Sequence, residues 1–190
     1  MTVKEIIQKR RAYWSLDPVE KPQDYIDPLM MAAQLSPSCF NHQPWHYICV
    51  YEPSALDEMK QVLSDGNTWA HDASMIIAVC CKKEDDCVIY DREYFLFDTG
   101  LATAFLILQA TELGLVAHPI AGYSPRKTRA VLHIPDAYQV ITLVIIGKHA
   151  DSLKPSLSEQ QKKREYKRPE RKPFSVFVHH NTFTKEESNG

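Results

Sequence analysis

The stretch Ser36-Pro-Ser-Cys-Phe-Asn-His-Gln-Pro-Trp45 divides two segments of different character and sets the expected fold around it. Ahead of it, the apolar run 29–35 is typical of a short helix, and behind it residues 46–51 are rich in strand formers. The prolines and the short polar side chains prevent either element from continuing through the stretch. We therefore predict a polar helix-to-strand connection over 36–45.

Two amide side chains make this connection a candidate binding loop. Asn41 and Gln43 lie two positions apart, and each offers both hydrogen-bond donors and acceptors. Such groups suit the edge of a flat heterocycle, such as a base or a flavin ring. The same residues would also serve an ordinary turn closed by Pro44 and Trp45, because loops of this composition are common on protein surfaces.

Composition limits the classes of partner. The chain has 190 residues, of which 44% are hydrophobic and 24% charged, which is ordinary for one globular domain with a core. A net charge of −2 argues against a protein that coats nucleic acid or an anionic membrane. The longest apolar runs have about seven residues, whereas about 20 are needed to span a bilayer. We expect neither a nucleic-acid partner nor a membrane partner.

The cysteines and the N-terminus indicate a cytoplasmic location. Cys39, Cys49, Cys80, Cys81 and Cys87 form an odd set without a C-x-x-C pair, and Cys80 and Cys81 lie in an apolar run where burial is expected. Residues 1–5 contain no apolar signal segment. Together these features predict a reducing compartment.

Other chemistries find little support in the residue pattern. The six glycines form no phosphate-binding G-x-G-x-x-G or G-x-x-x-x-G-K motif, so a bound phosphate would be held by Arg and Lys side chains. His179 and His180 would point to opposite faces of a strand, and we predict no metal site. Cys39 remains open as a nucleophile, because it lies in an exposed loop beside the candidate site.

The rest of the chain predicts alternating helices and strands. The predicted helices are Thr2 to about 11, Asp27 to 35, Ser54 to Leu63, Asp91 to Leu115 and Ser124 to Leu132. Thr2 with Glu5 and Ser54 with Asp57 fit capping boxes, Asp27 and Ser124 are expected N-caps, and Gly114 is the expected C-cap of the long helix. The predicted strands are 46–51, 75–81, 116–123 with its closing turn, 140–146 and 174–178. Residues 150–173 are polar and read as a solvated linker. This order predicts a mixed sheet flanked by helices, α+β or three-layer in type. We expect one domain over 1–190, with 150–190 as an extended C-terminal arm.

Five segments in sequence order resemble the nitroreductase family, the dimeric oxidoreductases that bind FMN and use NAD(P)H. The segments are Arg10-Arg11-Ala12-Tyr13-Trp14, Pro37-Ser38-Cys39-Phe40-Asn41-His42-Gln43-Pro44-Trp45, Asp98-Thr99-Gly100-Leu101-Ala102, Pro119-Ile120-Ala121-Gly122-Tyr123 and Arg171-Lys172-Pro173. The second segment is the strongest match. The resemblance covers about residues 3–178 and implies a three-layer α/β/α fold around a mixed, mainly antiparallel sheet. It also implies a homodimer in which the C-terminal strand is exchanged.

The resemblance implies where FMN binds. Basic residues from both ends of the chain would hold the phosphate, the 36–45 loop would reach the ring from the second subunit, and the segment 119–122 would face the flavin N5. The implied cofactor-binding residues are Arg10, Arg11, Ala12, Trp14, Pro37, Ser38, Cys39, Asn41, Gln43, Pro119, Ile120, Ala121, Gly122, Arg171 and Lys172. No side chain is assigned a catalytic role, because the flavin itself carries out the redox chemistry.

The implied reaction is ping-pong hydride transfer from NADH or NADPH through FMN to a small aromatic acceptor, a nitroaromatic or a quinone. Three positions depart from the family: Ala12 replaces a serine, Trp14 a cation, and Ala121 an acid. Without a cation near the ring, we expect a lower reduction potential or slower reduction, unless Arg11 or another cation reaches it. A flavin-binding protein with little turnover, and a non-enzymatic domain on the same scaffold, therefore stay as alternatives. The acceptor pocket is expected in the segments 60–70 and 85–97.

Overall fold

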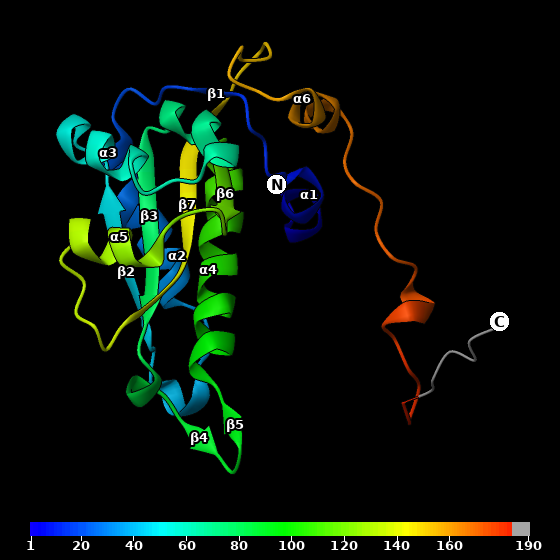
Figure 1. The fold of residues 1–190 in the computed structure, drawn as a ribbon. Coiled ribbons are helices and arrows are strands. Elements are labelled where there is room, and N and C mark those ends of the chain that lie inside the picture. The colour runs from blue at the N-terminus through cyan, green and yellow to red at the C-terminus, as the bar shows by residue number, and fades with distance from the viewer. Residues whose placement is uncertain (184–190) are drawn as a thin grey trace, which may run out of the picture.

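The computed structural model describes residues 1–183 and contains a central sheet with helices on both of its faces (Figure 1). The α-helices are α1 (Val3–Lys9), α2 (Ile26–Gln34), α3 (Pro53–Lys60), α4 (Phe95–Glu112), α5 (Pro125–Val131) and α6 (Glu159–Tyr166). The strands are β1 (Leu16–Asp17), β2 (Trp45–Val50), β3 (Met75–Cys81), β4 (Val88–Ile89), β5 (Arg92–Glu93), β6 (Val116–Ile120) and β7 (Gln139–His149). Short 3-10 turns are η1 (Pro22–Tyr25), η2 (Cys39–Asn41), η3 (Asp65–Asp72), η4 (Lys83–Asp85) and η5 (Phe174–Val176).

The main sheet is built around β7, the longest strand. β7 pairs with β3 along one edge and with β6 and β1 along the other, and β2 pairs with β3. Every pairing within residues 1–183 is antiparallel, as is the separate β4–β5 hairpin. The prediction of a mainly antiparallel sheet is therefore confirmed, while the parallel pairing that a mixed sheet requires does not occur in this part of the chain.

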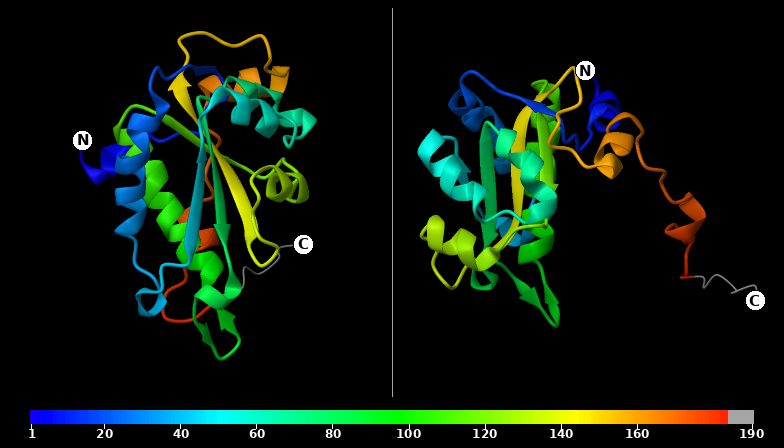
Figure 2. Two further views of the ribbon diagram at one scale, coloured as in Figure 1. Left: turned by 90° about the vertical axis from the view of Figure 1, so that its left-hand side faces the viewer. Right: turned by 45° about the horizontal axis from the view of Figure 1, so that its top comes forward.

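The sheet carries a hydrophobic core on each face, because alternate residues of a strand point to opposite sides. On β3, Ile76 and Ala78 face the core beneath α3, η3 and α5, while Met75 and Ile77 face the core beneath α2 and α4. All seven residues of β3 are buried, which confirms the prediction of a covered strand over 75–81. Figure 2 shows the two helical groups on either side of the strands.

Helix α4 begins later than predicted. Residues 88–93 form the β4–β5 hairpin, so the helix starts at Phe95 rather than near Asp91. It ends at Glu112 rather than at Leu115, and Gly114, the expected C-cap position, adopts a φ of 78°, the left-handed conformation that glycine accommodates without steric cost. The β4–β5 hairpin therefore lies at the N-terminal end of α4.

Two helix starts confirm the predicted caps. Thr2 and Glu5 form the reciprocal capping box of α1, and the Ser124 hydroxyl accepts a hydrogen bond from the Lys127 N–H at α5. Proline occupies the first turn of α5, as its fixed φ favours.

Two other starts differ from the prediction. Helix α2 begins at Ile26, before Asp27, because η1 runs directly into it. Helix α3 is preceded by Glu52 rather than capped by Ser54, and Asp57 forms an ion pair with Lys60 instead of closing a capping box.

The segment 150–173 is not the solvated linker that its composition indicated. Ser158 and Gln161 form a capping box at the start of α6, and Leu157 is buried in the core next to it. Glu165 is only 2% exposed. The backbone N–H groups that donate hydrogen bonds to it lie about 150 residues away in sequence, so no local sequence pattern could predict this contact.

The expected strand 174–178 is instead the 3-10 turn η5, followed by irregular chain. A strand needs a neighbour to pair with. Beyond α6 the chain runs away from the body (Figure 1), and Phe174 and Phe177 are exposed. Within residues 1–183, no helix combines the length and the apolar character that crossing a membrane requires.

Candidate functional site

Basic side chains from both ends of the chain meet beside α1. Arg10 and Arg11 follow α1, and they line a cavity of 120 Å³ together with side chains of the α6 region. The complete lining is Arg10, Arg11, Ala12, Trp14, Arg164, Arg168, Pro169 and Arg171. The sequence named five of these eight residues for FMN. It missed the pair Arg164 and Arg168, whose only local signal is the run of cations in 162–172.

This arginine cluster carries positive charge that no acid neutralises. Within the described residues, none of its guanidinium groups forms an ion pair with a carboxylate. Burial, and then the positive charges of Arg168 and Arg171, lower the pKa of Arg10 from its ordinary value. A bound anion would relieve that repulsion, so the cluster is suited to a phosphate.

Backbone carbonyls and one buried acid hold the cluster in place. The Arg168 guanidinium donates hydrogen bonds to the Gln8 and Arg10 carbonyls at 2.6 Å. Arg11 donates to the carbonyls of Arg164 and Tyr166, and its guanidinium lies 4.7 Å from the centre of the Tyr13 ring. The Arg11 side chain is thereby directed toward α6.

Glu165 fastens α6 to the segment after α1. Its carboxylate accepts hydrogen bonds from the Trp14 and Ser15 N–H groups at 3.0 and 3.1 Å, and it lies 3.2 Å from Nε2 of His149. The Trp14 ring packs edge-on against His118, which in turn stacks on Trp69. The position that departs from the family is therefore a packed aromatic ring.

His118 connects the arginine cluster to the segment 119–122. Its Nδ1 atom lies 2.9 Å from the Tyr13 carbonyl, and burial lowers the pKa of the imidazole. Pro119 and Ala121 are exposed, whereas Ile120 is buried. The Gly122 carbonyl accepts hydrogen bonds from Ser64 and Asn67, and any side chain at position 122 would collide with those same two residues.

The candidate loop has a strained backbone. Phe40, Asn41 and Gln43 have φ angles of 45°, 60° and 53°, in the left-handed region that costs a side-chain-bearing residue free energy. The Gln43 N–H donates to the Ser38 hydroxyl, and Asn41 and Gln43 are exposed while Pro44 is buried. Pro37 is exposed and Ser38 half-buried, so the loop presents its polar side chains outward.

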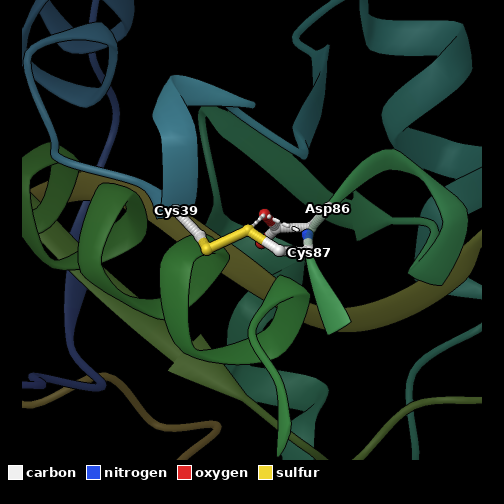
Figure 3. A group of neighbouring side chains, drawn as sticks. All are labelled: Cys39, Asp86 and Cys87. Atoms are coloured by element: carbon white, nitrogen blue, oxygen red, sulfur yellow. Dashed lines mark hydrogen bonds between the residues drawn. A yellow bond between two sulfur atoms is a disulfide. The ribbon is translucent and has the colours of Figure 1, made fainter. Parts of the chain in front are cut away.

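A disulfide joins this loop to the residue before the β4–β5 hairpin. Cys39 and Cys87 are bonded (Figure 3), whereas the cysteine pattern predicts a reducing compartment, where disulfides are rare. The pairing joins positions 48 residues apart, which the sequence pattern could not indicate. The Cys39 N–H also donates to Asp98 at 2.6 Å. Cys39 is therefore not a free nucleophile here, and its thiol is not available to hold a metal.

The loop and the arginine cluster lie at opposite ends of α4. The loop is bound to Asp98 near the start of α4, while Arg11 shares a cavity with Thr111 and Gly114 at its end. Thirteen residues of helix separate Asp98 from Thr111, or about 20 Å. The structure thus brings the residues 10–14 together with 164–171, and places the residues 37–43 far from both.

An apolar groove of 590 Å³ runs along the outer side of α4. Its lining is Val3, Ile6, Pro28, Met31, Ala32, Leu35, Phe105, Leu108, Gln109 and Glu112. Val3, Met31 and Leu35 are each more than 60% exposed, which is unusual for large apolar side chains gathered in one place. The groove belongs to α1, α2 and α4, the elements next to the two candidate half-sites.

The chain is similar to several known proteins. The family model described as "Nitroreductase family" matches residues 66–148. A protein of Archaeoglobus fulgidus named "Putative NADH dehydrogenase/NAD(P)H nitroreductase" is 32% identical over 127 residues, which cover 64% of this chain and 71% of that protein.

A protein of Methanothermobacter thermautotrophicus with the same name is 32% identical over 117 residues, or 62% of this chain; the match spans only 59% of that relative's length. A solved structure described as an oxidoreductase containing FMN superposes with a TM-score of 0.83 at 27% identity, covering 97% of this chain and 94% of that one. The fold, the order of the matching segments and these relatives lead to one conclusion: the chain belongs to the nitroreductase family.

Proposed function

We propose that this protein is a homodimeric, cytoplasmic FMN-dependent oxidoreductase. NADH or NADPH would donate a hydride, and a small aromatic acceptor, a nitroaromatic or a quinone, would take the electrons in a second half-reaction. The chain would act as one domain, with 150–190 reaching the partner subunit. The observation that carries the proposal is the arginine cluster, whose guanidinium groups form no ion pair with a carboxylate among the described residues.

A two-fold dimer would assemble the site from two incomplete halves. If the two-fold axis ran perpendicular to α4, the helix would face its own copy in the opposite direction, and the start of one α4 would meet the end of the other. The loop of one protomer would then approach the arginine cluster of its partner. The exposed apolar groove along α4, and the exposed Phe174 and Phe177 of the arm, supply surface that such a partner would cover.

The residue types present at the two half-sites suit FMN. Arg10, Arg168 and Arg171 would hold the phosphate, with Arg11 and Lys172 beside them. Asn41 and Gln43 of the partner would hydrogen-bond the ring edge. When bound, FMN supplies the hydride-accepting and electron-donating chemistry, while the protein orients both substrates and limits access of water.

One local observation favours the alternative of a flavin-binding protein with little turnover. Trp14 is packed against His118, and Arg11 is tied to carbonyl groups of α6, so no cation is directed at the ring from this segment. A cation there would stabilise the negative charge of reduced flavin. A Trp14→Lys variant should raise the reduction potential of bound FMN, and an unchanged potential would remove this alternative's support.

The direct test is the absorbance spectrum of the purified protein under anaerobic conditions. We expect a yellow protein that releases FMN on denaturation and is bleached by NADH or NADPH. Bleaching followed by recovery with a quinone supports the oxidoreductase. A yellow protein that is not bleached supports the binding-only alternative, and a colourless protein that does not take up added FMN rejects both.

Subunit complementation tests the composite site. Arg168→Ala damages the phosphate end, and Gln43→Ala damages the loop end. In a mixed dimer of the two variants one site carries both defects and the other carries neither. Random exchange makes half the dimers mixed, so about a quarter of the sites should regain wild-type affinity for FMN. If both halves came from one protomer, mixing would restore nothing.

A further inference from the structure

The cross-link at the loop end of α4 has a chemical environment that an inert structural disulfide does not need. Cys39 belongs to the strained turn η2, and Cys87 directly precedes the β4–β5 hairpin. Asp86, next to Cys87, has a side chain that is 0% exposed. A carboxyl group is costly to bury in this way unless it is neutral or fully hydrogen-bonded.

Asp86 is placed against the Cys87 sulfur. Its Oδ1 atom lies 3.5 Å from Sγ of Cys87 and accepts a hydrogen bond from the Cys87 N–H at 2.8 Å (Figure 3). Its Oδ2 atom is buried without a hydrogen-bond partner among the described residues. The carboxyl group is therefore within reach of one sulfur of the disulfide, and its other side-chain neighbours are His42 and Asp98.

The surroundings of Asp86 favour its protonated form. The titratable groups that face it are Asp98 on α4, His42 after η2, at 3.5 Å, and Cys81 at the end of β3. Burial, together with the carboxylate of Asp98, raises the pKa of Asp86 above its ordinary value, against the opposing influence of the Cys87 N–H and His42. In its protonated form, the Asp86 carboxyl group beside the Cys87 sulfur can donate a proton.

The two sulfurs differ in access. Cys39 is partly exposed, whereas Cys87 is only 8% exposed. An external thiolate therefore reaches the Cys39 sulfur, and the sulfur that departs is that of Cys87. The departing thiolate is the one that lies beside Asp86.

We propose that Cys39–Cys87 is a reversible redox cross-link, opened by a dithiol reductant, in which the Asp86 carboxyl protonates the departing Cys87 sulfur. The reductant's thiolate bonds to Cys39, the Cys39–Cys87 bond breaks, and the Asp86 proton passes to Cys87. The second thiol of the reductant then displaces Cys39, which takes a proton from solvent. The dithiol leaves as a disulfide, having lost the two electrons that the two cysteines gained.

Reduction would release the candidate binding loop. Three left-handed residues, Phe40, Asn41 and Gln43, persist only while their surroundings hold them. The disulfide is one restraint, and the others are the hydrogen bonds Cys39 N–H to Asp98 and Gln43 N–H to Ser38. Its loss frees the loop to relax. Reduction would also weaken FMN binding, and this expectation rests on the proposed function. The reduction of the disulfide itself does not depend on it.

The test uses the full chain without added flavin. The protein is incubated with graded dithiothreitol in native buffer, free thiols are counted by mass after alkylation, and amide hydrogen exchange is followed in both states. We expect two additional thiols to appear reversibly, with amides of 36–45 exchanging at least about tenfold faster while those of β3 do not change. Reduction only in denaturant, or unchanged exchange in 36–45, would overturn the proposal.

Single substitutions test the roles of Asp86 and Cys87, with Cys49 as a control. Asp86→Asn should slow native reduction at least about tenfold, since it cannot donate the proton, and should flatten its dependence on pH. Cys87→Ser should reproduce the rapid loop exchange without reductant, and Cys49→Ser, at a free cysteine outside the pair, should behave as wild type. An Asp86→Asn rate equal to wild type would remove Asp86 from the step.

Two further measurements keep the outcomes distinct. Zinc held by the reduced protein against a chelator would overturn the redox assignment, because Cys39, Asp86 and Cys87 place their ligand atoms within 4.8 Å of one another. FMN titration of the oxidised and reduced forms tests the link to function. Absence of FMN binding in both forms would reject the proposed function while leaving the reversible cross-link intact.

Discussion

The two ends of α4 accumulate unfavourable free energy in different ways. At its C-terminal end the cost is electrostatic, because the arginines around Arg10 and Arg168 repel one another and none pairs with a carboxylate within residues 1–183. At its N-terminal end the cost is conformational, because Phe40, Asn41 and Gln43 hold left-handed backbone angles. Each end also has a buried acid, Glu165 or Asp86, in a different role.

The difference indicates which kind of ligand would stabilise each end of α4. Repelling cations are stabilised by an anion, whereas a strained loop is stabilised by directional hydrogen bonds to a rigid partner. A flavin nucleotide offers both, a phosphate at one end and a heterocycle at the other. In the proposed dimer the two contacts would come from different protomers, since about 20 Å of helix separates Asp98 from Thr111 within one chain. The following predictions test this contrast.

The largest effect is expected at the acid that anchors the charged end. Glu165→Ala leaves the Trp14 and Ser15 N–H groups without their acceptor, and Ser15 is only 1% exposed. Each lost partner of a buried donor costs about 1–3 kcal/mol, so the free energy of unfolding should fall by about 2–5 kcal/mol. Urea unfolding of both proteins, fitted with one common dependence of the free energy on urea concentration, measures this loss.

Helix α6 offers a matched control for that experiment. The Glu159 side chain is 82% exposed and pairs with Lys162, an exposed contact of small value. Glu159→Ala should therefore change the free energy of unfolding by no more than about 0.5 kcal/mol. Equal losses in the two variants would mean that Glu165 acts only through helix α6 and not through the segment 14–15.

The next effect concerns the anion at the charged end. Arg171 lines the arginine cavity, and its removal should weaken FMN binding about tenfold or more, the value of one charge-assisted hydrogen bond. Riboflavin, which lacks the phosphate, should bind Arg171→Ala and wild type equally. Fluorescence titration of both ligands measures the difference, with Arg126→Ala on α5 as a control for net charge.

Equal losses for FMN and riboflavin would contradict that assignment. The phosphate would then lie elsewhere, and the cluster would hold a different anion. A loss restricted to FMN in Arg171→Ala, absent in Arg126→Ala, would locate the phosphate at the cavity and sharpen the contrast between the two ends.

The sequence predicted the interior of the fold better than its connections. Strand 75–81 and the caps at Thr2 and Ser124 are local patterns, and the structure confirms each of them. The polar segment 150–173 was misread because the buried contact of Glu165 depends on backbone donors far away in sequence. Composition indicates how polar a segment is, but it does not indicate which distant residues the segment contacts in the folded chain.

The candidate site shows the same limit. The residues 10–14 and 36–45 could be named from the sequence because their types and spacing carry the resemblance. Arg168 and the Cys39–Cys87 pair could not, because both depend on segments brought together only by folding. Half of the site is thus a local pattern, and half is a product of tertiary structure.

Acid should act on the two ends in opposite directions. Burial lowers the pKa of His118 below its ordinary value of 6.5, so its contribution to stability is present above pH 6.5 and is lost as the pH falls through the lowered value. Burial raises the pKa of Asp86 above 3.8, so its contribution is present at low pH and is lost as the pH rises through the raised value.

Unfolding free energies measured between pH 4 and 8 separate these contributions. His118→Gln should remove the loss of stability on acidification, while Asp86→Asn should remove the loss on raising the pH. Parallel pH profiles in the two variants would show that other groups govern the titration and that the two ends do not differ in this respect.

The smallest effect is expected within the strained loop. Ser38→Ala removes the hydroxyl that accepts from the Gln43 N–H at 3.0 Å, in a loop that is otherwise exposed. Water can replace an exposed partner, so the free energy of unfolding should fall by only about 0.5–1.5 kcal/mol. Ser54→Ala, at an exposed serine that caps no helix, should be neutral.

The effect of Ser38→Ala should become larger once Cys39–Cys87 is reduced, because the Ser38 hydroxyl then holds the left-handed turn without the cross-link. A Ser38→Ala effect independent of the disulfide would show that the two restraints act on separate parts of the loop.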